Sequence, residues 1–251
     1  MPVHAVLPMK RPAAPIASGL FMTENKSLVS GPKSLLQDLS PGELARVINR
    51  AHRKSYPAGT SIFAQGAQHD GIFIIEQGCV RVFYTSASGR EITLAYWNPG
   101  NFVGGPDVLN GGKHMWSGVT AVETQVLMLP SRELRQLIVE IPALALGIIE
   151  GLSFKGKCYS ALAQILGTRS VTERLAHLLL QLADIYGRPT KNGIFIDAAF
   201  THVDLAHVVG ATRQWITMML KRLQSRGVIT CSRGQIYVVD RGMLQTIETK
   251  A

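Results

Sequence analysis

The segment 201–226, THVDLAHVVGATRQWITMMLKRLQSR, constrains the fold more than any other part of the chain, because it carries the start and stop signals of two short helices. Thr201 and Asp204 form a capping-box pattern that begins a first helix. Gly210 favours the left-handed backbone that ends a helix, and Thr212 stands where a second helix needs its cap. The pattern predicts a helix-turn-helix.

The predicted second helix separates an apolar face from a polar, basic one. Four apolar residues follow the spacing of a buried helix face: Ile216, Met219, Leu220 and Leu223. Arg213 and Gln214 lie in its first turn, the part of such a helix that reaches base edges in a major groove. Arginine pairs with guanine, and glutamine with adenine, through two parallel hydrogen bonds. The face therefore suits sequence reading, although an ordinary helical hairpin with a solvated basic face remains an alternative.

A hairpin pattern follows the motif and supports DNA binding. Val228 and Ile229 precede a turn at Arg233-Gly234, and the apolar run 236–239 follows it, as in the wing of a winged helix. Residues 201–251 hold seven Lys or Arg against three Asp or Glu, and the whole chain carries a net charge of +9. This balance favours a polyanionic partner. The residues that we predict to contact DNA are Thr201, His202, Thr212, Arg213, Gln214, Thr217, Met218, Lys221, Arg222 and Arg233.

Composition excludes several classes of protein. At 251 residues and 46% hydrophobic content, the chain can bury the cores of two modest domains. It has no apolar run near eighteen residues and no uninterrupted apolar region near its first residue, so we expect a cytoplasmic protein without membrane contact. The three cysteines, Cys79, Cys158 and Cys231, lack metal-ligand spacing. We expect buried or incidental thiols and no metal.

Short strand patterns separated by glycine turns fill the region from Tyr56 to Leu129. The strand candidates are IFIIEQ, CVRVFYT, REITLAYW and TQVLMLP. Regular spacing of this kind indicates a small antiparallel barrel or jelly roll.

A helical period returns after Pro142 and persists to about Gly167, a rod of roughly 40 Å at ~1.5 Å per residue. Small and apolar residues recur along it with the 4-3 spacing of a two-stranded coil, so we predict a dimer interface. A solitary core helix is the competing interpretation. The predicted interface residues are Ile149, Leu152, Gly156, Tyr159, Ala163 and Leu166. A dimer would hold two recognition helices about 34 Å apart, the separation of successive major grooves.

These patterns predict an α+β chain with four parts. Residues 1–33 form a flexible N-terminal arm, residues 34–140 an antiparallel β-roll or jelly-roll barrel, residues 141–168 a dimerisation helix, and residues 169–251 a winged helix-turn-helix domain. Two further capping boxes mark helix starts, at Ser40-Pro41-Gly42-Glu43 and at Ser170 with Glu173.

A glycine-punctuated barrel, a long helix and a C-terminal winged helix, in that order, resemble the Crp–Fnr family of bacterial transcription regulators. The resemblance runs from about Leu36 to Val239 and rests on four segments: YPAGTSIFAQGAQHDGIFIIEQGCVRVF, PGNFVGG, VTERLAHLLLQLA and VGATRQWITMMLKRL. It implies a homodimer that binds a two-fold symmetric double-stranded DNA operator and that recruits or blocks RNA polymerase.

The sequence departs from the family at the residues that hold cyclic AMP. Members that bind this nucleotide have a Gly-Glu pair and an Arg-Ser or Arg-Thr pair where this chain has Gly104-Gly105 and Met115-Trp116. The family arginine neutralises the cyclic phosphate, and Met115 lacks the charge to do so. No cysteine precedes Cys79, and the barrel positions that align with family haem ligands are 103–105. Cyclic AMP, an iron–sulfur cluster and haem are therefore not expected.

The resemblance places a tentative effector pocket between the barrel and the long helix. Its residues are Gly104, Gly105, Asp107, Met115, Trp116, Tyr159 and Ser160. Aromatic and methionine side chains suit a planar organic effector, in a pocket less charged than the nucleotide type. A barrel without a ligand, with protein level or a thiol setting activity, is an open alternative. His114 is expected on a surface loop, and a place in the ligand pocket is the alternative.

The recognition helix departs from the family as well. Many members have Arg-Glu early and a second Arg one turn later, where this chain has Arg213, Gln214 and Met218. Segment 184–193 aligns with the region where family activators touch polymerase, which favours activation. Two other functions stay open: a cupin-like metalloenzyme, which needs clustered ligands such as the H-x-H that this chain lacks, and an RNA-binding winged helix.

Overall fold

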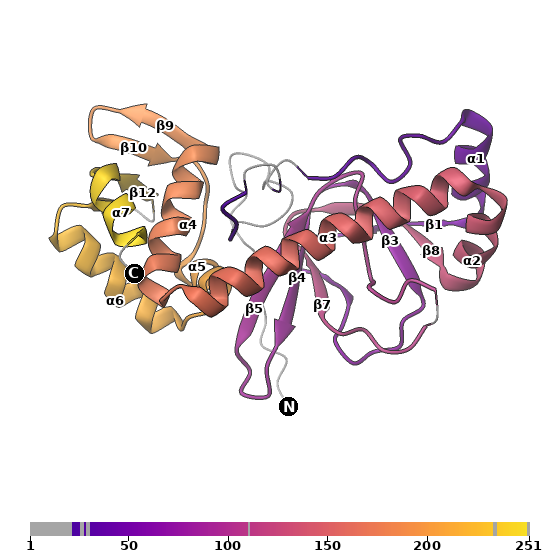
Figure 1. The fold of residues 1–251 in the computed structure, drawn as a ribbon, viewed down its shortest axis with the longest axis horizontal. Coiled ribbons are helices and arrows are strands. Elements are labelled where there is room, and N and C mark those ends of the chain that lie inside the picture. The colour runs from indigo at the N-terminus through magenta and orange to yellow at the C-terminus, as the bar shows by residue number, and fades with distance from the viewer. Residues whose placement is uncertain (1–21, 26–27, 29–30, 110, 233–234, 250–251) are drawn as a thin grey trace.

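The computed structural model describes residues 22–25, 28, 31–109, 111–232 and 235–249. A long helix, α3 (Pro142–Thr168), connects a strand-rich domain to a smaller C-terminal domain (Figure 1). The expected order of barrel, rod and winged helix is confirmed, and the fold class is α+β. Within the described ranges no single helix has the length and hydropathy to cross a bilayer, and only a pair of helices bent by 118°, residues 131–140 with 142–168, meets that test jointly.

Two antiparallel four-stranded sheets form the jelly-roll barrel. One sheet has the order β1-β8-β3-β6 and the other the order β2-β7-β4-β5. The strands are β1 (His52–Tyr56), β2 (Ser61–Phe63), β3 (Gly71–Gln77), β4 (Val80–Thr85), β5 (Glu91–Trp97), β6 (Phe102–Val103), β7 (Ser117–Thr120) and β8 (Thr124–Pro130). The four strands expected from the sequence are β3, β4, β5 and β8. The sequence analysis did not single out the other four, which are two to five residues long, because short strands show too few alternations to form a pattern.

Helices α1 (Pro41–Arg50) and α2 (Ser131–Glu140) pack with the start of α3 on one sheet of the barrel. The capping box that begins α1 is present, with the Ser40 backbone N–H donating to Glu43 at 2.8 Å. Arg46 and Arg50 form ion pairs with Glu140 across these two helices. The sequence analysis did not predict α2, whose ten residues begin directly after a strand.

The C-terminal domain builds a helix-turn-helix on a small antiparallel sheet of order β11-β12-β10-β9. The capping box that begins α4 is present, with the Ser170 N–H donating to Glu173 at 2.7 Å. The final helix packs against α4. The elements are α4 (Val171–Tyr186), β9 (Gly187–Thr190), β10 (Gly193–Ile196), α5 (His202–Val209), α6 (Arg213–Ser225), β11 (Ile229–Ser232), β12 (Gln235–Val238) and α7 (Arg241–Glu248).

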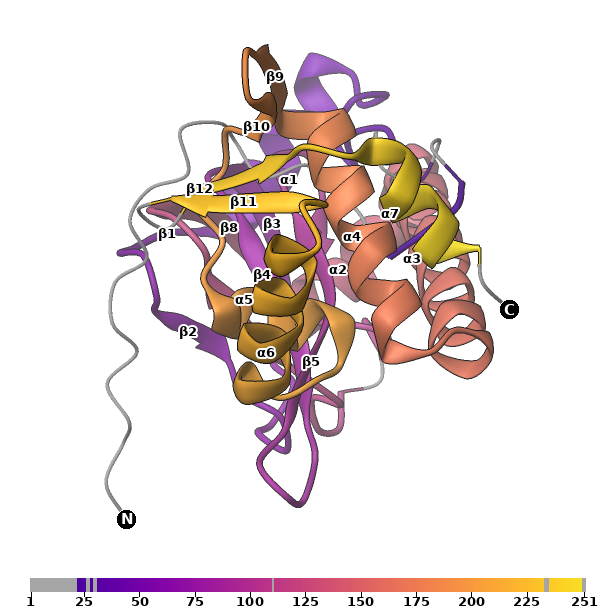
Figure 2. The same ribbon diagram turned by 90° about the vertical axis from the view of Figure 1, so that its left-hand side faces the viewer.

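The two domains contact each other beside α3, where α5 packs against β5 (Figure 2). Arg81 donates to Glu91 at 2.8 Å, and the His207 ring on α5 lies 3.4 Å from the Arg81 guanidinium and 3.5 Å from the Glu91 carboxylate. One hydrophobic core continues from the barrel into the C-terminal domain. The first helix of the DNA-binding motif is thereby attached to a barrel hairpin.

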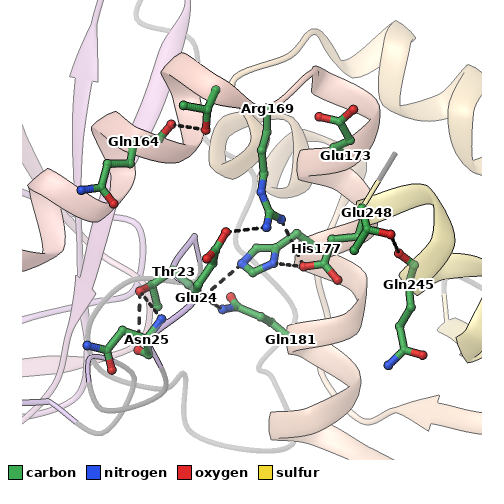
Figure 3. Close-up of polar contacts among 12 residues, drawn as sticks. Thr23, Glu24, Asn25, Gln164, Arg169, Glu173, His177, Gln181, Gln245 and Glu248 are labelled. Atoms are coloured by element: carbon green, nitrogen blue, oxygen red, sulfur yellow. Dashed lines mark hydrogen bonds and ion pairs between the residues drawn. The ribbon is translucent and has the colours of Figure 1, made fainter. Parts of the chain in front are cut away.

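The described residues of the N-terminal segment also pack at the junction of the domains, and most of the predicted flexible arm, residues 1–21, lies outside the described residues. Met22 and Thr23 are buried. Figure 3 shows the Thr23 carbonyl accepting hydrogen bonds from His177 and Gln181 of α4, and Glu24 pairing with Arg169 at 2.5 Å. Arg169 follows the last residue of α3, so this segment contacts the junction between α3 and α4, residues 167–169, where we expect a hinge.

Arg169 and His177 also hold the last helix at the same place. Glu248 of α7 lies 3.1 Å from Arg169 and 2.6 Å from His177 (Figure 3). A cavity of about 540 Å³ is lined by these residues, by Asp184 and Arg241, and by others from the N-terminal segment, α4 and α7. The hinge is therefore surrounded by both terminal regions of the described chain.

Candidate nucleic-acid interface and sensor site

Helix caps fix the angle between α5 and α6, as the sequence predicts. The Thr201 hydroxyl oxygen accepts from the Asp204 N–H at 3.1 Å, and the Asp204 carboxylate accepts from the Thr201 N–H at 2.8 Å. Gly210 has φ of 71° in the turn, a conformation that costs glycine little. The Thr212 hydroxyl accepts from the Trp215 N–H at 3.2 Å and begins α6.

The predicted base-reading side chains lie together on one solvent-exposed strip of α6. The opposite face of this helix is buried in the core of the C-terminal domain through Ile216, Met219, Leu220 and Leu223. Met218 is 56% exposed on the outer strip. Figure 2 shows α6 in front of the body of the molecule, with the sheet that carries the wing above it. The exposed members of the predicted contact set on α6 are Arg213, Gln214, Met218, Lys221 and Arg222.

Two threonines of the predicted set direct their hydroxyl protons into the protein. The Thr201 hydroxyl donates to the Asp204 carboxylate at 2.6 Å, and the Thr217 hydroxyl donates to the Arg213 carbonyl at 3.0 Å. The Thr217 oxygen also lies 2.8 Å from His202 Nδ1. A hydroxyl has one proton to give, so neither donates to a phosphate in this conformation. Arg233, which the sequence predicts at the tip of the wing, lies outside the described residues.

The predicted effector residues differ widely in exposure. Met115 is 60% exposed, and Asp107 and Ser160 are exposed as well. Trp116 does meet Tyr159 of α3, with ring centroids 5.5 Å apart. Gly104 is buried with φ of 114°, and a Cβ there would lie 2.9 Å from the carbonyl oxygen of Gly71. Gly105, next to it, is half-buried. Trp116 and Tyr159 are the pair that joins barrel to helix.

His114 is buried, so its expected place on a surface loop is wrong. It is 6% exposed, stacks on Phe63, and lies with its ring centroid 4.7 Å from that of His69, which is 5% exposed. Its Nδ1 lies 3.0 Å from the Gly104 carbonyl oxygen. Burial and the neighbouring His69 lower the pKa of His114. Two imidazoles alone make a poor metal site, and across the described ranges no three His, Cys, Asp or Glu are grouped to hold a metal ion.

Sequence reasoning missed one charged residue, Lys155, on the inner face of α3. Its ammonium nitrogen lies 3.7 Å from the ring centroid of Trp97 and 4.5 Å from that of Phe102. Among the described residues its ammonium group meets no hydrogen-bond partner, and burial lowers the pKa of Lys155 to about 7. A signal for it existed, because Lys155 continues an apolar stripe of period 3.5 on this helix. That stripe is Leu144, Ile148, Gly151, Lys155, Cys158, Leu162 and Ile165.

Part of the predicted dimer interface lies on a second, exposed stripe of α3, whereas Tyr159 of that set contacts the barrel. Ile149 is 60% exposed, and its neighbour Leu146 is 62% exposed. Of the other predicted interface residues, Gly156 and Ala163 are exposed, and Leu152, Tyr159 and Leu166 are half-buried. The helix thus buries one apolar face within the subunit and leaves another uncovered.

The fold and these two sites define a class: a DNA-binding regulator in which a sensor barrel is joined by a long helix to a winged helix-turn-helix. Comparison with known protein families agrees. Residues 53–140 match the cyclic nucleotide-binding domain, and residues 173–247 match the Crp-like helix-turn-helix domain. The chain belongs to the Crp–Fnr family, and it is a DNA-binding transcription regulator rather than an enzyme.

Relatives with different regulatory roles are about equally similar to this chain. The cyclic AMP receptor protein of Thermus thermophilus is 27% identical over 85% of this chain and 95% of its own length. The global nitrogen regulator of Synechococcus elongatus is 26% identical over 82% of this chain and 91% of its own length. A solved structure of the c-di-GMP-responsive global regulator of Xanthomonas campestris has a TM-score of 0.72 at 22% identity, covering 79% of this chain and 99% of that one. Overall similarity therefore does not select an effector.

Proposed function

We propose that this regulator is a cytoplasmic homodimer that binds a two-fold symmetric duplex operator and that its barrel responds to a small organic effector other than cyclic AMP. The observation that carries the proposal is the outer strip of α6, where Arg213 and Gln214 in the first turn are exposed side by side. Guanine and adenine present complementary hydrogen-bonding edges to these two side chains. Lys221 and Arg222, further along α6, suit phosphate oxygens.

The dimer is supported by the uncovered stripe of α3. Leu146 and Ile149 expose apolar side chains on a helix of 27 residues, and Gly156 would let a partner helix approach closely. Two copies joined along this stripe would present two α6 helices to neighbouring major grooves.

Activation through RNA polymerase is supported by the β9–β10 hairpin. This hairpin occupies residues 187–196 at the edge of the winged-helix sheet, and segment 184–193 is the one that resembles the polymerase-contacting region of family activators. An effector other than cyclic AMP is supported by Gly105 and Met115, because neither side chain offers a charged group to a cyclic phosphate.

The base-reading role is tested on duplexes that the purified protein selects from random DNA. Arg213→Ala is expected to weaken binding to the selected duplex by about 1–3 kcal/mol and to relax preference at one base pair of each half-site. Lys221→Ala is the control, because loss of a phosphate contact should weaken selected and random duplexes alike. Fluorescence anisotropy at fixed salt measures both. Equal losses on both kinds of DNA for both variants would remove Arg213 from base reading.

A further inference from the structure

Lys155 is buried where long α3 meets the barrel. It is 8% exposed, one turn before Tyr159 and one turn after Gly151, and Phe102 packs against α3 at that glycine. Trp97 and Phe102, the rings beneath its ammonium group, are 0% and 1% exposed. A lysine in this position is costly, because a buried charge loses its hydration.

The surroundings of Lys155 only partly compensate this cost. The faces of Trp97 and Phe102 attract a cation, but an ammonium group also has three N–H donors, and no acceptor meets them. The titratable group that acts on Lys155 is Cys158, one turn further along α3. Burial raises the pKa of Cys158 to about 11, so near neutral pH it is a neutral thiol and supplies no counter-charge. The site therefore holds a cation without an anion.

We propose that Lys155 receives the carboxylate of a small aromatic monoanion, which is the effector of this regulator. The inference rests on the proposed function, in which the barrel responds to an organic effector. Charge decides the class: the rings and the thiol around Lys155 add no second positive charge, so one carboxylate is neutralised and a phosphate dianion is not.

The aromatic part of the effector follows from the rings around Lys155. The Trp97 indole N–H donates to the Tyr159 hydroxyl, and the Tyr159 ring lies 5.5 Å from Trp116 at the start of β7. Phe154 meets the edge of Trp97 at a centroid distance of 6.2 Å. Aromatic side chains pair with planar groups by offset or edge-to-face packing, so this cluster favours an aromatic ligand over an aliphatic one. Trp116 is half-buried, so the Trp116–Tyr159 contact is the outer side of this cluster.

Such a ligand would affect the position of α3 relative to the barrel, because it would contact residues of both. Lys155 and Tyr159 lie on α3, whereas Trp97, Phe102 and Trp116 belong to the barrel. An anion bound to Lys155 and stacked on barrel rings would favour the arrangement in which α3 lies against the barrel. Since α3 leads directly to the hinge, the bound arrangement would set the positions of the two α6 helices.

Benzoate and benzamide test the inference, since they have nearly the same shape and differ in charge. Calorimetry and tryptophan fluorescence on the full-length dimer should show benzoate binding at least 10-fold more tightly than benzamide. Lys155→Met should weaken benzoate binding at least 10-fold and leave benzamide unchanged. Lys157→Met, which changes an exposed lysine two residues further on, should bind benzoate as the unmodified protein does. Circular dichroism and elution volume establish that each variant is folded.

Several results would overturn the inference: equal affinity for benzoate and benzamide, undiminished benzoate binding by Lys155→Met, no benzoate binding at all, or tighter binding of inorganic phosphate than of benzoate. The proposed function fails separately. If the protein binds benzoate through Lys155 but selects no duplex, the sensor inference stands and DNA reading falls. If it selects a symmetric duplex but does not bind benzoate, DNA reading stands and the inference about Lys155 falls.

Discussion

The outer face of α6 and the inner face of α3 both carry positive charge, in opposite surroundings. Arg213 and Lys221 are exposed, so their charges remain hydrated until a polyanion approaches. Lys155 is buried against two aromatic rings without a hydrogen-bond acceptor. The exposed charges of α6 stay hydrated and can meet any nucleic acid with little loss of solvation free energy. The buried charge of Lys155 on α3 is unfavourable until an anion pairs with it.

The largest effect is expected from the uncovered stripe of α3, which joins the two subunits in the proposed dimer and so brings two copies of α6 together. Ile149→Glu would place two like charges near the two-fold axis and convert the dimer into a monomer. Binding to a two-half-site duplex should fall on the order of 100-fold, because the second contact is no longer intramolecular. Sedimentation and anisotropy measure the two effects. Val139→Glu on α2, which changes an 80% exposed side chain, is the control.

Lys155→Met is expected to raise the free energy of unfolding at pH 7 by about 1–4 kcal/mol, because it removes an unpaired buried charge. The sign follows from the pKa, which is lowered from 10.5 in the unfolded chain to about 7 in the fold. Protonation of the unfolded chain therefore destabilises the unmodified protein as pH falls from 10.5 towards 7. The advantage of the variant should vanish above pH 10.5. Urea unfolding at several pH values would reveal a pH-independent difference if the charge were irrelevant.

Removal of a cap should have a smaller effect, confined to the DNA-binding domain. Thr201→Ala deletes the hydroxyl that accepts from the Asp204 N–H, and is expected to cost about 1 kcal/mol of stability. Thr201→Ser keeps the cap, so its free energy of unfolding should lie within a few tenths of a kcal/mol of that of the unmodified protein. Because the Thr201 hydroxyl proton is directed to Asp204, Thr201→Ser should also bind DNA normally. Chemical denaturation and anisotropy check both statements.

The smallest effect is expected at His114 in the barrel. Its pKa is lowered by burial and by His69, so the folded state favours the neutral ring. The stability that this provides is full above the unfolded pKa of about 6.5 and is lost as pH falls below it, because the unfolded chain takes up the proton first. Thermal unfolding between pH 5 and 8 should show a flatter profile for His114→Gln. An unchanged slope would assign the acid sensitivity to another group.

The two regions also differ in how well the sequence predicts them. Thr201, Gly210 and Thr212 act on residues within four positions, so caps and turn could be recognised from their order alone. The barrel site is made by contacts between distant segments. His69 and His114 meet across 45 residues, and Lys155 reaches Trp97 across 58, which no local spacing records.

Short or terminal elements were missed for a related reason. α7 carries a legible cap, since Asp240 accepts from the Met243 N–H at 2.8 Å, but its eight residues bury only Leu244 fully. Burial of Met22 depends on the assembled core, and a Pro- and Ser-rich segment contains no apolar period from which that burial could be predicted. The inward stripe of α3 that contains Lys155 did have a local signal, its period of 3.5, but the rings that Lys155 contacts belong to distant strands.

Glu24 and Glu248 lie near opposite ends of the described chain, and both form ion pairs with Arg169, the residue that follows α3. Both ends of the described chain therefore act on the residue that links α3 to α4. Trimming or extending the protein near these ends is expected to disturb that junction directly.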